Sequence, residues 1–197
     1  MYFPIMLNIK DKNVLIIGAG NVAFHKAKKL LACECHLKVV SYFFTKEFLK
    51  LENIEFIKDH YNKGYLQNNY MVIAATDNKD LNNEIYRDAL ELGILCSVVS
   101  GGASDFILPA SFNRGDLSIS VSTNGKSPSL SKRIVRDLKC VYDESYEEKV
   151  DLLGQIREEM LLSEEIPENE KKFILNEMVN FSVEELRIFA KKMFEGV

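Results

Sequence analysis

The sequence predicts an α/β protein built on a parallel sheet, followed by a β-hairpin and a small C-terminal helical domain. Short apolar runs alternate with amphipathic stretches through the first hundred residues, which is typical of strands and helices in turn. An alternating apolar and polar pattern then indicates a hairpin, and helical spacing continues towards the end of the chain. We therefore divide the chain into residues 1–104, 105–141 and 142–197.

The clearest pattern lies in residues 13–32. Val14–Ile17 is a short run of large apolar residues, as expected for a strand that is buried on both faces. Residues 18–23 then read G-x-G-x-x-A, and a helix with one apolar face is predicted to follow. That face consists of Ala23, Ala27, Leu30 and Leu31. Strand, glycine turn and helix together predict a dinucleotide-binding unit in a Rossmann-like sheet.

Each position of this turn has a physical reason. Gly18 allows the tight turn, and Gly20 lets the backbone approach a pyrophosphate. The helix that begins near Asn21 and Val22 offers free N–H groups and a positive dipole end to the phosphates. The alternative is a tight strand-to-helix turn that binds nothing. The strand and the helix stand where the binding mechanism needs them, which favours the cofactor site.

Polar residues also follow the later predicted strands. In a parallel sheet of this kind the ligand binds beyond the carboxyl ends of the strands, so these residues should share one crevice with the glycine turn. They are Ser41, Thr76, Asp77 and Ser100. A carboxylate about twenty residues after the turn normally binds the cofactor ribose, but the second strand here ends in Ser41-Tyr42. No Arg stands there to hold a 2′-phosphate, and Ser41 with local backbone could serve a ribose, which favours NAD over NADP.

Local signals place the remaining elements. Asp77 or Asn78 can cap a helix that Gly93 ends, and Ser127 can cap a helix that begins at Pro128. A capping box at residues 182–185 predicts the start of the last helix. The other expected elements are a helix at 45–51, strands at 37–41, 54–57, 70–75 and 94–99, a hairpin of 106–112 and 117–122, and a helical stripe from 146 to 160.

Composition excludes several classes of function. The 197 residues carry a formal net charge of −4, which gives no electrostatic footprint for nucleic acid. The apolar runs are too short to span a membrane, and residues 1–7 are too short for a signal peptide. The four cysteines have no paired spacing and the three histidines have no ligand spacing, so we expect reduced thiols in a cytoplasmic protein and no metal site.

Several motifs together resemble the precorrin-2 dehydrogenase family, which includes the N-terminal module of siroheme synthase. The similarity runs over about residues 2–140 and is highly specific. It rests on Phe3-Pro4-Ile5, residues 14–26, Ala74-Ala75-Thr76-Asp77 with Leu81-Asn82, Asp105-Phe106-Ile107-Leu108-Pro109-Ala110, Arg114-Gly115-Asp116-Leu117, and residues 122–128. The helical tail is similar mainly through residues 153–157.

The resemblance implies NAD-dependent oxidation of precorrin-2 to sirohydrochlorin on the path to siroheme or cobalamin. It also implies a homodimer formed through the hairpin and helical regions, and some members of the family insert Fe²⁺ into sirohydrochlorin. Precorrin-2 is a polycarboxylate, and the loop before the helix at 128 offers an anion site. The candidate substrate residues are Arg114, Thr123, Asn124, Gly125, Lys126 and Ser127. The alternative for the cations is a solvated basic face.

One departure from the family pattern concerns catalysis. The family usually carries an aspartate after this strand, proposed as general base and metal-handling residue, whereas this chain has Ser100. A serine cannot act as a carboxylate base near neutral pH. Asp105 is the nearest alternative carboxylate, although it could instead have a structural role. Asp77 is another candidate, and its alternative role is to cap a helix. We therefore keep two other functions open, a sirohydrochlorin chelatase and a non-catalytic protein that binds NAD or tetrapyrrole.

Overall fold

The computed structural model describes residues 2–99, 101–164 and 166–195. The chain forms two compact units, Met1–Leu108 and Pro109–Val197. The hairpin and the later helices belong to the second unit, and residues 105–108 belong to the first. The division into three parts stays a prediction. No helix in the described part of the chain is both long and apolar enough to cross a membrane.

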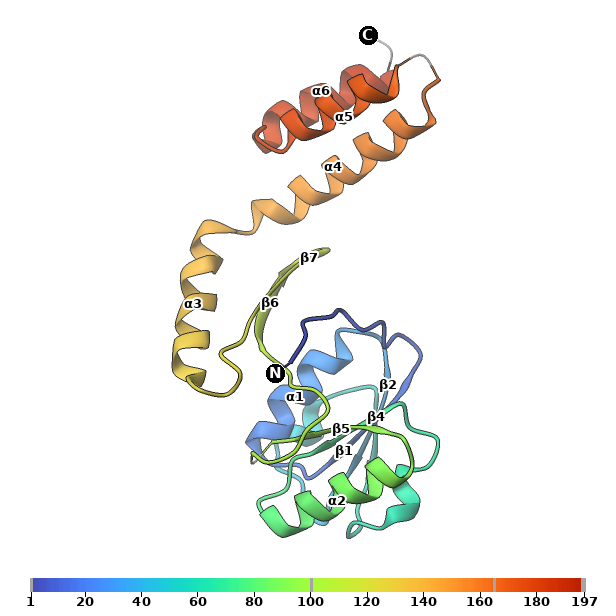
Figure 1. Ribbon diagram of the computed structural model, residues 1–197, viewed down its shortest axis with the longest axis vertical. Helices are drawn as coiled ribbons and strands as arrows, with labels where there is room; N and C mark the ends of the chain where they lie inside the picture. Colours follow the sequence, from blue (N-terminus) through green and yellow to red (C-terminus); the bar gives the residue numbers. More distant parts are fainter. Residues whose placement is uncertain (1, 100, 165, 196–197) are drawn as a thin grey trace. The chain divides into compact units, whose positions relative to one another are not determined.

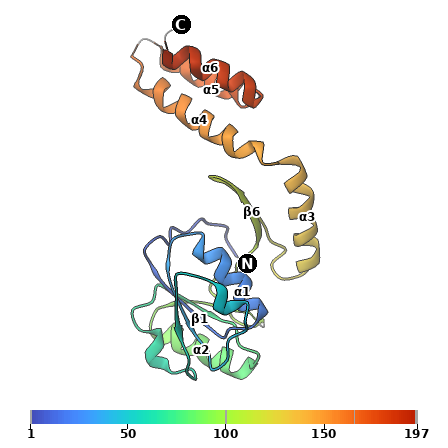
Figure 2. The ribbon, with the colours of Figure 1, turned by 180° about the vertical axis from the view of Figure 1, so that it is seen from behind.

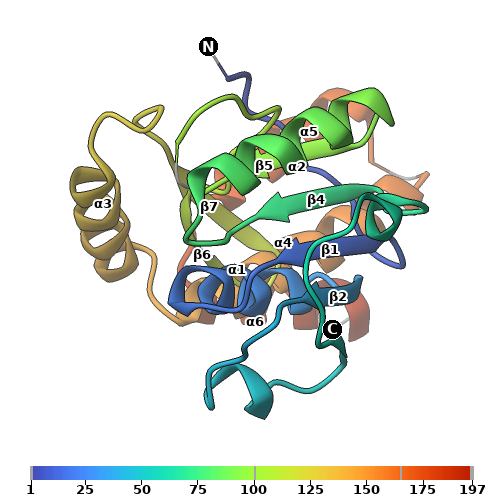
Figure 3. The same cartoon turned by 90° about the horizontal axis from the view of Figure 1, so that it is seen from below.

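The first unit is a five-stranded parallel sheet with the strand order β3-β2-β1-β4-β5 (Figure 1). Its strands are β1 (Asn13–Ile17), β2 (His36–Val40), β3 (Ile54–Ile57), β4 (Met71–Ala74) and β5 (Leu95–Val98). The central strand β1 pairs with β2 and β4, and the three lie side by side in Figure 3. Because both faces of β1 are covered, its apolar run leaves Val14–Ile17 at most 2% exposed. The predicted fold class is confirmed.

The two α-helices of this unit cover opposite faces of the sheet (Figures 1 and 2). Alternate residues of β1 point to opposite faces, so each helix meets a different pair. The small and apolar face of α1 (Asn21–Leu31) packs against Val14 and Ile16. The helix α2 (Lys79–Glu91) packs Ile85 and Ala89 in a second cluster with Leu15 and Ile17.

The strand order brings the ends of β1 and β4 together. The chain runs from β1 outward through β2 to β3, then crosses to the other side of β1 for β4 and β5. Ligands of open α/β sheets bind beyond the carboxyl ends of the strands at such a reversal. Backbone bonds tie these ends together, since the Gly18 N–H donates to the Val40 oxygen at 2.8 Å and the Ala75 N–H to the Ile17 oxygen at 2.8 Å.

Two short segments of the first unit differ from the prediction. The helix expected at 45–51 is a single 3-10 turn, η1 (Phe48–Lys50), which buries Phe48 completely among other aromatic rings. A second 3-10 turn, η2 (Lys63–Leu66), had no clear sequence signal, because it is held by the Asn62 side chain rather than by apolar periodicity. Both turns bury one large apolar residue each, which is their contribution to the core.

The second unit begins with a two-stranded antiparallel hairpin and continues as helices. Its elements are β6 (Ala110–Arg114), β7 (Leu117–Val121), α3 (Pro128–Val141), α4 (Ser145–Leu162), α5 (Glu168–Met178) and α6 (Val183–Glu195). The expected strand at 106–112 was placed too early. Pro109 has no N–H to donate to a ladder, and Phe106 and Leu108 pack instead against the core of the first unit.

The last three helices lie together (Figure 2), and their side chains form one small core. It is formed by Ile156 and Met160 of α4, Met178 of α5, and Leu186 and Ala190 of α6. The predicted capping box of α6 is present. The Ser182 N–H donates to Glu185 Oε2 at 2.7 Å, and the Glu185 N–H donates to Ser182 Oγ at 3.3 Å.

Candidate functional site

The glycine turn after β1 requires a glycine at its first position. Gly18 has a φ of +102°, which side-chain-bearing residues rarely adopt. A Cβ added there would lie 2.5 Å from the backbone oxygen of Ala75, just beyond β4. The backbone at Gly18 therefore lies closer to the end of β4 than a residue with a side chain could come. The predicted role of Gly18 in a tight turn agrees with this geometry.

The second glycine of the turn has a different reason to be there. Gly20 has an ordinary φ of −82°, and a Cβ added to it would meet nothing within 4 Å. The packing of the described chain therefore does not require a glycine at this position. What the missing side chain provides is open space beside the first turn of α1, which is what a close approach of pyrophosphate to the backbone needs.

The N-terminus of α1 suits an anion. No described side chain caps it, and its first turn contains no acidic residue. Asn21 and Val22 are exposed, with Val22 at 51%. The free N–H groups and the positive dipole end are thus available to a phosphate. These residues fit the pyrophosphate of a dinucleotide.

The segment after β4 is fixed by a buried asparagine. Asn82 of α2 is fully buried, and its Oδ1 accepts hydrogen bonds from the Thr76 N–H at 3.1 Å and the Thr76 hydroxyl at 2.7 Å. Its Nδ2 donates to the Thr76 oxygen at 3.0 Å. Asn78, not Asp77, caps α2, because its side chain accepts from the Asp80 and Leu81 N–H groups. Asp77 is exposed beside Thr76 at the carboxyl edge.

Sequence reasoning did not assign a role to Asn82. An asparagine in an amphipathic helix resembles any polar surface residue, as the adjacent and exposed Asn83 does, and only the fold shows that Asn82 faces the backbone after β4. The available signal was its position, because it falls on the same helical face as Ile85 and Ala89. An asparagine on an otherwise apolar face is buried and must have hydrogen-bond partners.

Ser41 lies at the carboxyl end of β2, where the ribose of a dinucleotide is expected. Its N–H donates to the Ile57 oxygen at 3.1 Å, and its hydroxyl donates to the Phe43 oxygen at 2.7 Å. The hydroxyl proton is therefore already donated within the loop after β2, although the hydroxyl oxygen can still accept a hydrogen bond from a ligand. A role for Ser41 in ribose binding stays a prediction.

Ser100 lies outside the described residues, so its predicted place in the crevice has no structural description. Asp105, the alternative base, is held against β5. Its Oδ2 accepts from the Cys96 N–H at 2.9 Å, its Oδ1 from the Tyr86 hydroxyl at 3.3 Å, and its own N–H donates to the Cys96 oxygen. Ser104 likewise accepts from the Val98 N–H at 2.8 Å. These contacts cover the edge of β5 and favour a structural role for Asp105.

Cys96 cannot replace the missing base. Burial, followed by the charge of the nearby Asp105, raises the pKa of its thiol to about 12. The side chain is fully buried and stays protonated near neutral pH. In the described part of the chain, no three His, Cys, Asp or Glu side chains are grouped so that they could hold a metal ion.

The candidate substrate loop belongs to the second unit and is built from its own side chains. Thr123 Oγ1 accepts from the Ser127 N–H at 3.0 Å and lies 3.2 Å from Ser131 Oγ. Ser127 caps α3 by accepting from the Leu130 N–H at 3.3 Å, as predicted. The residues between them, Asn124, Gly125 and Lys126, are exposed.

Arg114 is engaged inside the second unit. Its Nε donates to the Tyr142 oxygen at 3.2 Å, its Nη1 to the Asn113 oxygen at 3.2 Å, and its Nη2 pairs with Glu144 at 3.2 Å. The side chain is only 13% exposed. These contacts join the hairpin to the segment between α3 and α4, which favours a structural role over substrate binding.

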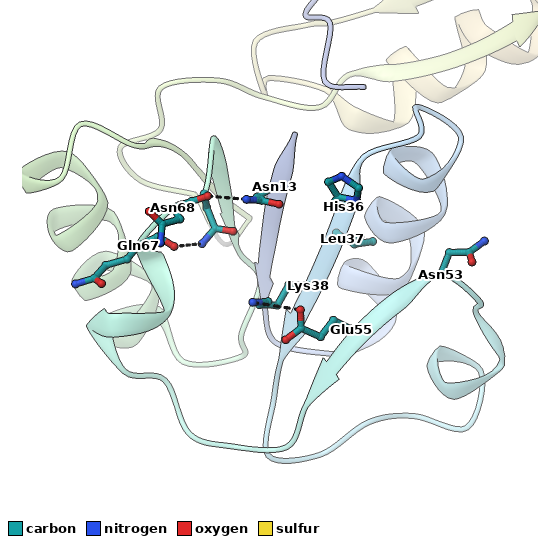
Figure 4. Close-up of a pocket in the computed structure, with 9 residues that line it drawn as sticks. Asn13, His36, Leu37, Lys38, Asn53, Glu55, Gln67 and Asn68 are labelled. Carbon is teal, nitrogen blue, oxygen red and sulfur yellow. Dashed lines mark hydrogen bonds and ion pairs between the residues drawn. The ribbon is translucent and has the colours of Figure 1, made fainter. Parts of the chain in front are cut away.

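A separate cavity of about 350 Å³ opens at the amino ends of the strands (Figure 4). Its polar lining includes an Asn13 amide that donates to the Asn68 oxygen at 2.9 Å, and a Lys38–Glu55 ion pair at 3.2 Å. None of the predicted cofactor residues lines it, because they follow the opposite ends of the same strands.

Comparison with known proteins bears on the family of this chain and on the class of its cofactor. Residues 5–110, which contain the whole parallel sheet, match the family described as putative NAD(P)-binding. The chain belongs to this family. Residues 114–139, which span the hairpin turn and most of α3, match the family described as sirohaem biosynthesis protein central. A nicotinamide dinucleotide is thus the cofactor class of the first unit, as the sequence predicts.

Relatives and solved structures extend the likeness over both units. Siroheme synthase of Psychrobacter arcticus is 35% identical over 159 residues, which are 79% of this chain and 29% of that protein. Siroheme synthase 2 of Pectobacterium atrosepticum is 31% identical over 79% of this chain and 35% of its own. This chain spans about a third of the length of these relatives.

A solved structure titled SirC, precorrin-2 dehydrogenase, aligns with a TM-score of 0.82 and 26% identity. The alignment covers 98% of this chain and 100% of that one. The resemblance to the precorrin-2 dehydrogenase family, which was based on short motifs, is confirmed.

Proposed function

We propose that this chain is an NAD-dependent dehydrogenase that oxidises precorrin-2 to sirohydrochlorin in tetrapyrrole biosynthesis. The likeness to SirC carries the proposal, because it extends over both units and covers 98% of this chain and 100% of that one. The glycine turn supports it independently, since Gly18 packs on the end of β4 while Gly20 leaves room for a pyrophosphate.

When bound, NAD⁺ supplies the acceptor for the hydride that leaves the macrocycle. The chain's own residues have to place the two reactants together. The N-terminus of α1 holds the pyrophosphate, and Thr76, fixed by Asn82, forms the neighbouring wall at the end of β4. The absence of a side-chain cap on α1 leaves its N–H groups to the cofactor. NAD is proposed over NADP because no arginine follows β2.

The reaction also releases one proton, and the chain has Ser100 where the family usually has an aspartate. Losing a general base typically costs on the order of 10² to 10⁴ in rate, whereas positioning can contribute more. Precorrin-2 gains conjugation on oxidation, so we infer that catalysis here is mainly positioning, with water or Asp105 taking the proton. Restoring a carboxylate with Ser100→Asp should raise turnover if that position faces the substrate.

The substrate carboxylates are proposed to bind the exposed segment from Asn124 to Lys126, before α3. Lys126 adds a positive charge, and the loop precedes a helix N-terminus. Thr123 and Ser127 shape the loop through their hydrogen bonds. Arg114 was a candidate, but its contacts suit it better to holding the hairpin in place.

We also propose a cytoplasmic homodimer formed through the second unit. Large apolar side chains of this unit are exposed, namely Leu130, Val141, Leu161, Leu162, Phe173, Val179 and Ile188. An isologous two-fold interface is the commonest way to cover such a surface. Light scattering at micromolar concentration should give twice the 22.5 kDa of the chain, and a particle of 22.5 kDa would reject the dimer. The cytoplasmic location rests on the four free cysteines.

The decisive experiment is an anaerobic assay of precorrin-2 with NAD⁺. We expect NADH and sirohydrochlorin to form in equal amounts and faster than in a matched reaction without protein. Binding of NAD⁺ with no turnover would instead indicate a non-catalytic binding protein. Insertion of iron into sirohydrochlorin without any NAD requirement would indicate a chelatase.

A further inference from the structure

An exposed aromatic patch lies at the carboxyl ends of β2 and β3. Tyr42 follows β2 by two residues and is 64% exposed, and the adjacent Phe43 is 74% exposed. The Tyr42 ring stacks on the imidazole of His60, which follows β3, with ring centroids 4.8 Å apart and planes at 13°. Large exposed aromatic residues grouped in this way commonly mark a binding surface.

The patch is connected to the cofactor turn. The Gly18 N–H donates to the Val40 oxygen at 2.8 Å, which ties the turn to the last residue of β2. Two residues further on comes Tyr42. The Ser41 N–H donates to the Ile57 oxygen, which brings the segments after β2 and β3 together. In sheets of this kind, a dinucleotide with its pyrophosphate on the first glycine turn extends its adenosine half towards the end of β2.

The usual contact at this end of the cofactor is missing. A carboxylate at the end of β2 normally accepts a hydrogen bond from the ribose, and Ser41 stands there instead. Its hydroxyl proton is already donated to the Phe43 oxygen. The nearby carboxylate of Asp59 accepts from the Tyr65 hydroxyl at 2.5 Å and from the His60 N–H at 2.8 Å. Hydrogen bonding to the ribose is therefore weaker than in sites with a dedicated acid.

We propose that the adenine of the cofactor stacks on one face of the Tyr42 ring, while His60 stacks on the other face. This inference rests on the proposed NAD-dependent function and adds the residue that fixes the adenosine half. A purine stacks on an aromatic side chain without needing hydrogen-bond partners, so the contact compensates for the missing carboxylate. His60 limits the rotation of the Tyr42 ring, which lowers the entropy lost on binding.

The test is calorimetric titration of the full chain with NAD⁺ and with ADP-ribose, both of which carry the adenine. Tyr42→Ser should raise both dissociation constants between about fivefold and one-hundredfold, the usual range for loss of a base–aromatic stack. Tyr42→Phe keeps the ring and should stay within about twofold of wild type, and His60→Ala should cause a smaller loss than Tyr42→Ser. Because Tyr42 is exposed, the unfolding temperature should not change.

Two further variants separate the possible outcomes. Tyr70→Ser removes a 39% exposed tyrosine beside the amino end of β4, at the opposite edge of the sheet, and should leave both dissociation constants unchanged. Gly20→Asp should abolish binding. If wild type binds and Gly20→Asp does not, but Tyr42→Ser binds as wild type does, the stacking proposal is overturned and the cofactor site stands. If wild type does not bind NAD⁺ at all, the proposed function fails with it.

Discussion

Two helices of this protein begin just after a turn that contains glycine, and the chain treats their N-termini differently. At α1, no described side chain caps the free N–H groups. At α3, Ser127 accepts from the Leu130 N–H and Pro128 removes a further donor at the first helical position. The first N-terminus leaves its donors to an external anion, whereas the second satisfies part of its own. We therefore expect α1 to bind phosphate more tightly than the α3 loop binds carboxylates.

The largest difference between the two turns should appear in folding. Gly18→Ala forces a side chain into a φ of +102° and 2.5 Å from the Ala75 oxygen, so we expect a loss of stability on the order of 3 kcal/mol. Gly125→Ala, with a φ of +80° and open space around it, should cost only about 1 to 2 kcal/mol. Urea unfolding of both variants measures this. Equal losses would mean that the contact with β4 contributes nothing.

The next difference concerns ligands. Gly20→Asp should raise the dissociation constant for NAD⁺ at least about one-hundredfold, because like charges a few ångströms apart at a protein surface repel by several kcal/mol. The fold should be kept, since a Cβ at Gly20 meets nothing within 4 Å. Gly125→Asp is the matched variant in the other turn.

The matched variant should behave in the opposite way. Gly125→Asp should leave NAD⁺ affinity unchanged and raise KM for precorrin-2, because its charge faces the proposed carboxylate site. Calorimetry with NAD⁺ and the anaerobic assay distinguish the two effects. An unchanged NAD⁺ affinity in Gly20→Asp would contradict the assignment of the cofactor turn.

A polar helix residue also anchors the chain at each of these places. Asn82 of α2 makes three hydrogen bonds to Thr76, in the segment against which Gly18 packs. Ser131 of α3 lies 3.2 Å from Thr123 Oγ1 and donates to the Ser127 oxygen at 3.3 Å. Asn82→Ala leaves the partly buried backbone groups of Thr76 without their side-chain partner, so we expect a loss of about 2 kcal/mol together with weaker NAD⁺ binding. Ser131→Ala should cost about 1 kcal/mol or less and leave NAD⁺ binding alone. Thermal unfolding and calorimetry of both variants test this.

A conservative variant checks the cause. Asn82→Asp keeps the size and the acceptor but puts a carboxylate in a fully buried position, so its loss of stability at neutral pH should be at least that of Asn82→Ala and should shrink as the pH falls and the carboxyl takes up a proton. If Asn82→Ala changes neither stability nor binding, the segment after β4 is held by the sheet alone.

The same comparison shows what the sequence can and cannot predict. The run Val14–Ile17 and the glycine turn predicted the sheet and its cofactor edge, because burial and backbone freedom leave a local pattern. The roles of Asn82 and Arg114 could not be predicted in this way, since their hydrogen-bond partners lie on segments whose positions only the fold determines. The start of β6 was misplaced for a related reason. Phe106 and Leu108 look like strand residues of the hairpin, but they belong to the first unit and pack against its core.

The smallest expected effect concerns the cap of α3. Ser127→Ala removes the oxygen that accepts from the Leu130 N–H, which should cost about 1 kcal/mol of stability. It also makes the N-terminus of α3 more like that of α1, because a donor becomes available to an external anion. Sulfate should therefore raise the unfolding temperature of Ser127→Ala more than that of wild type. The control is Ser129→Ala, in the same first turn but not at the capping position, which should respond to sulfate as wild type does. If sulfate stabilises all three proteins equally, an uncapped helix end alone does not make an anion site here, and the affinity of α1 for phosphate has to come from the open space at Gly20.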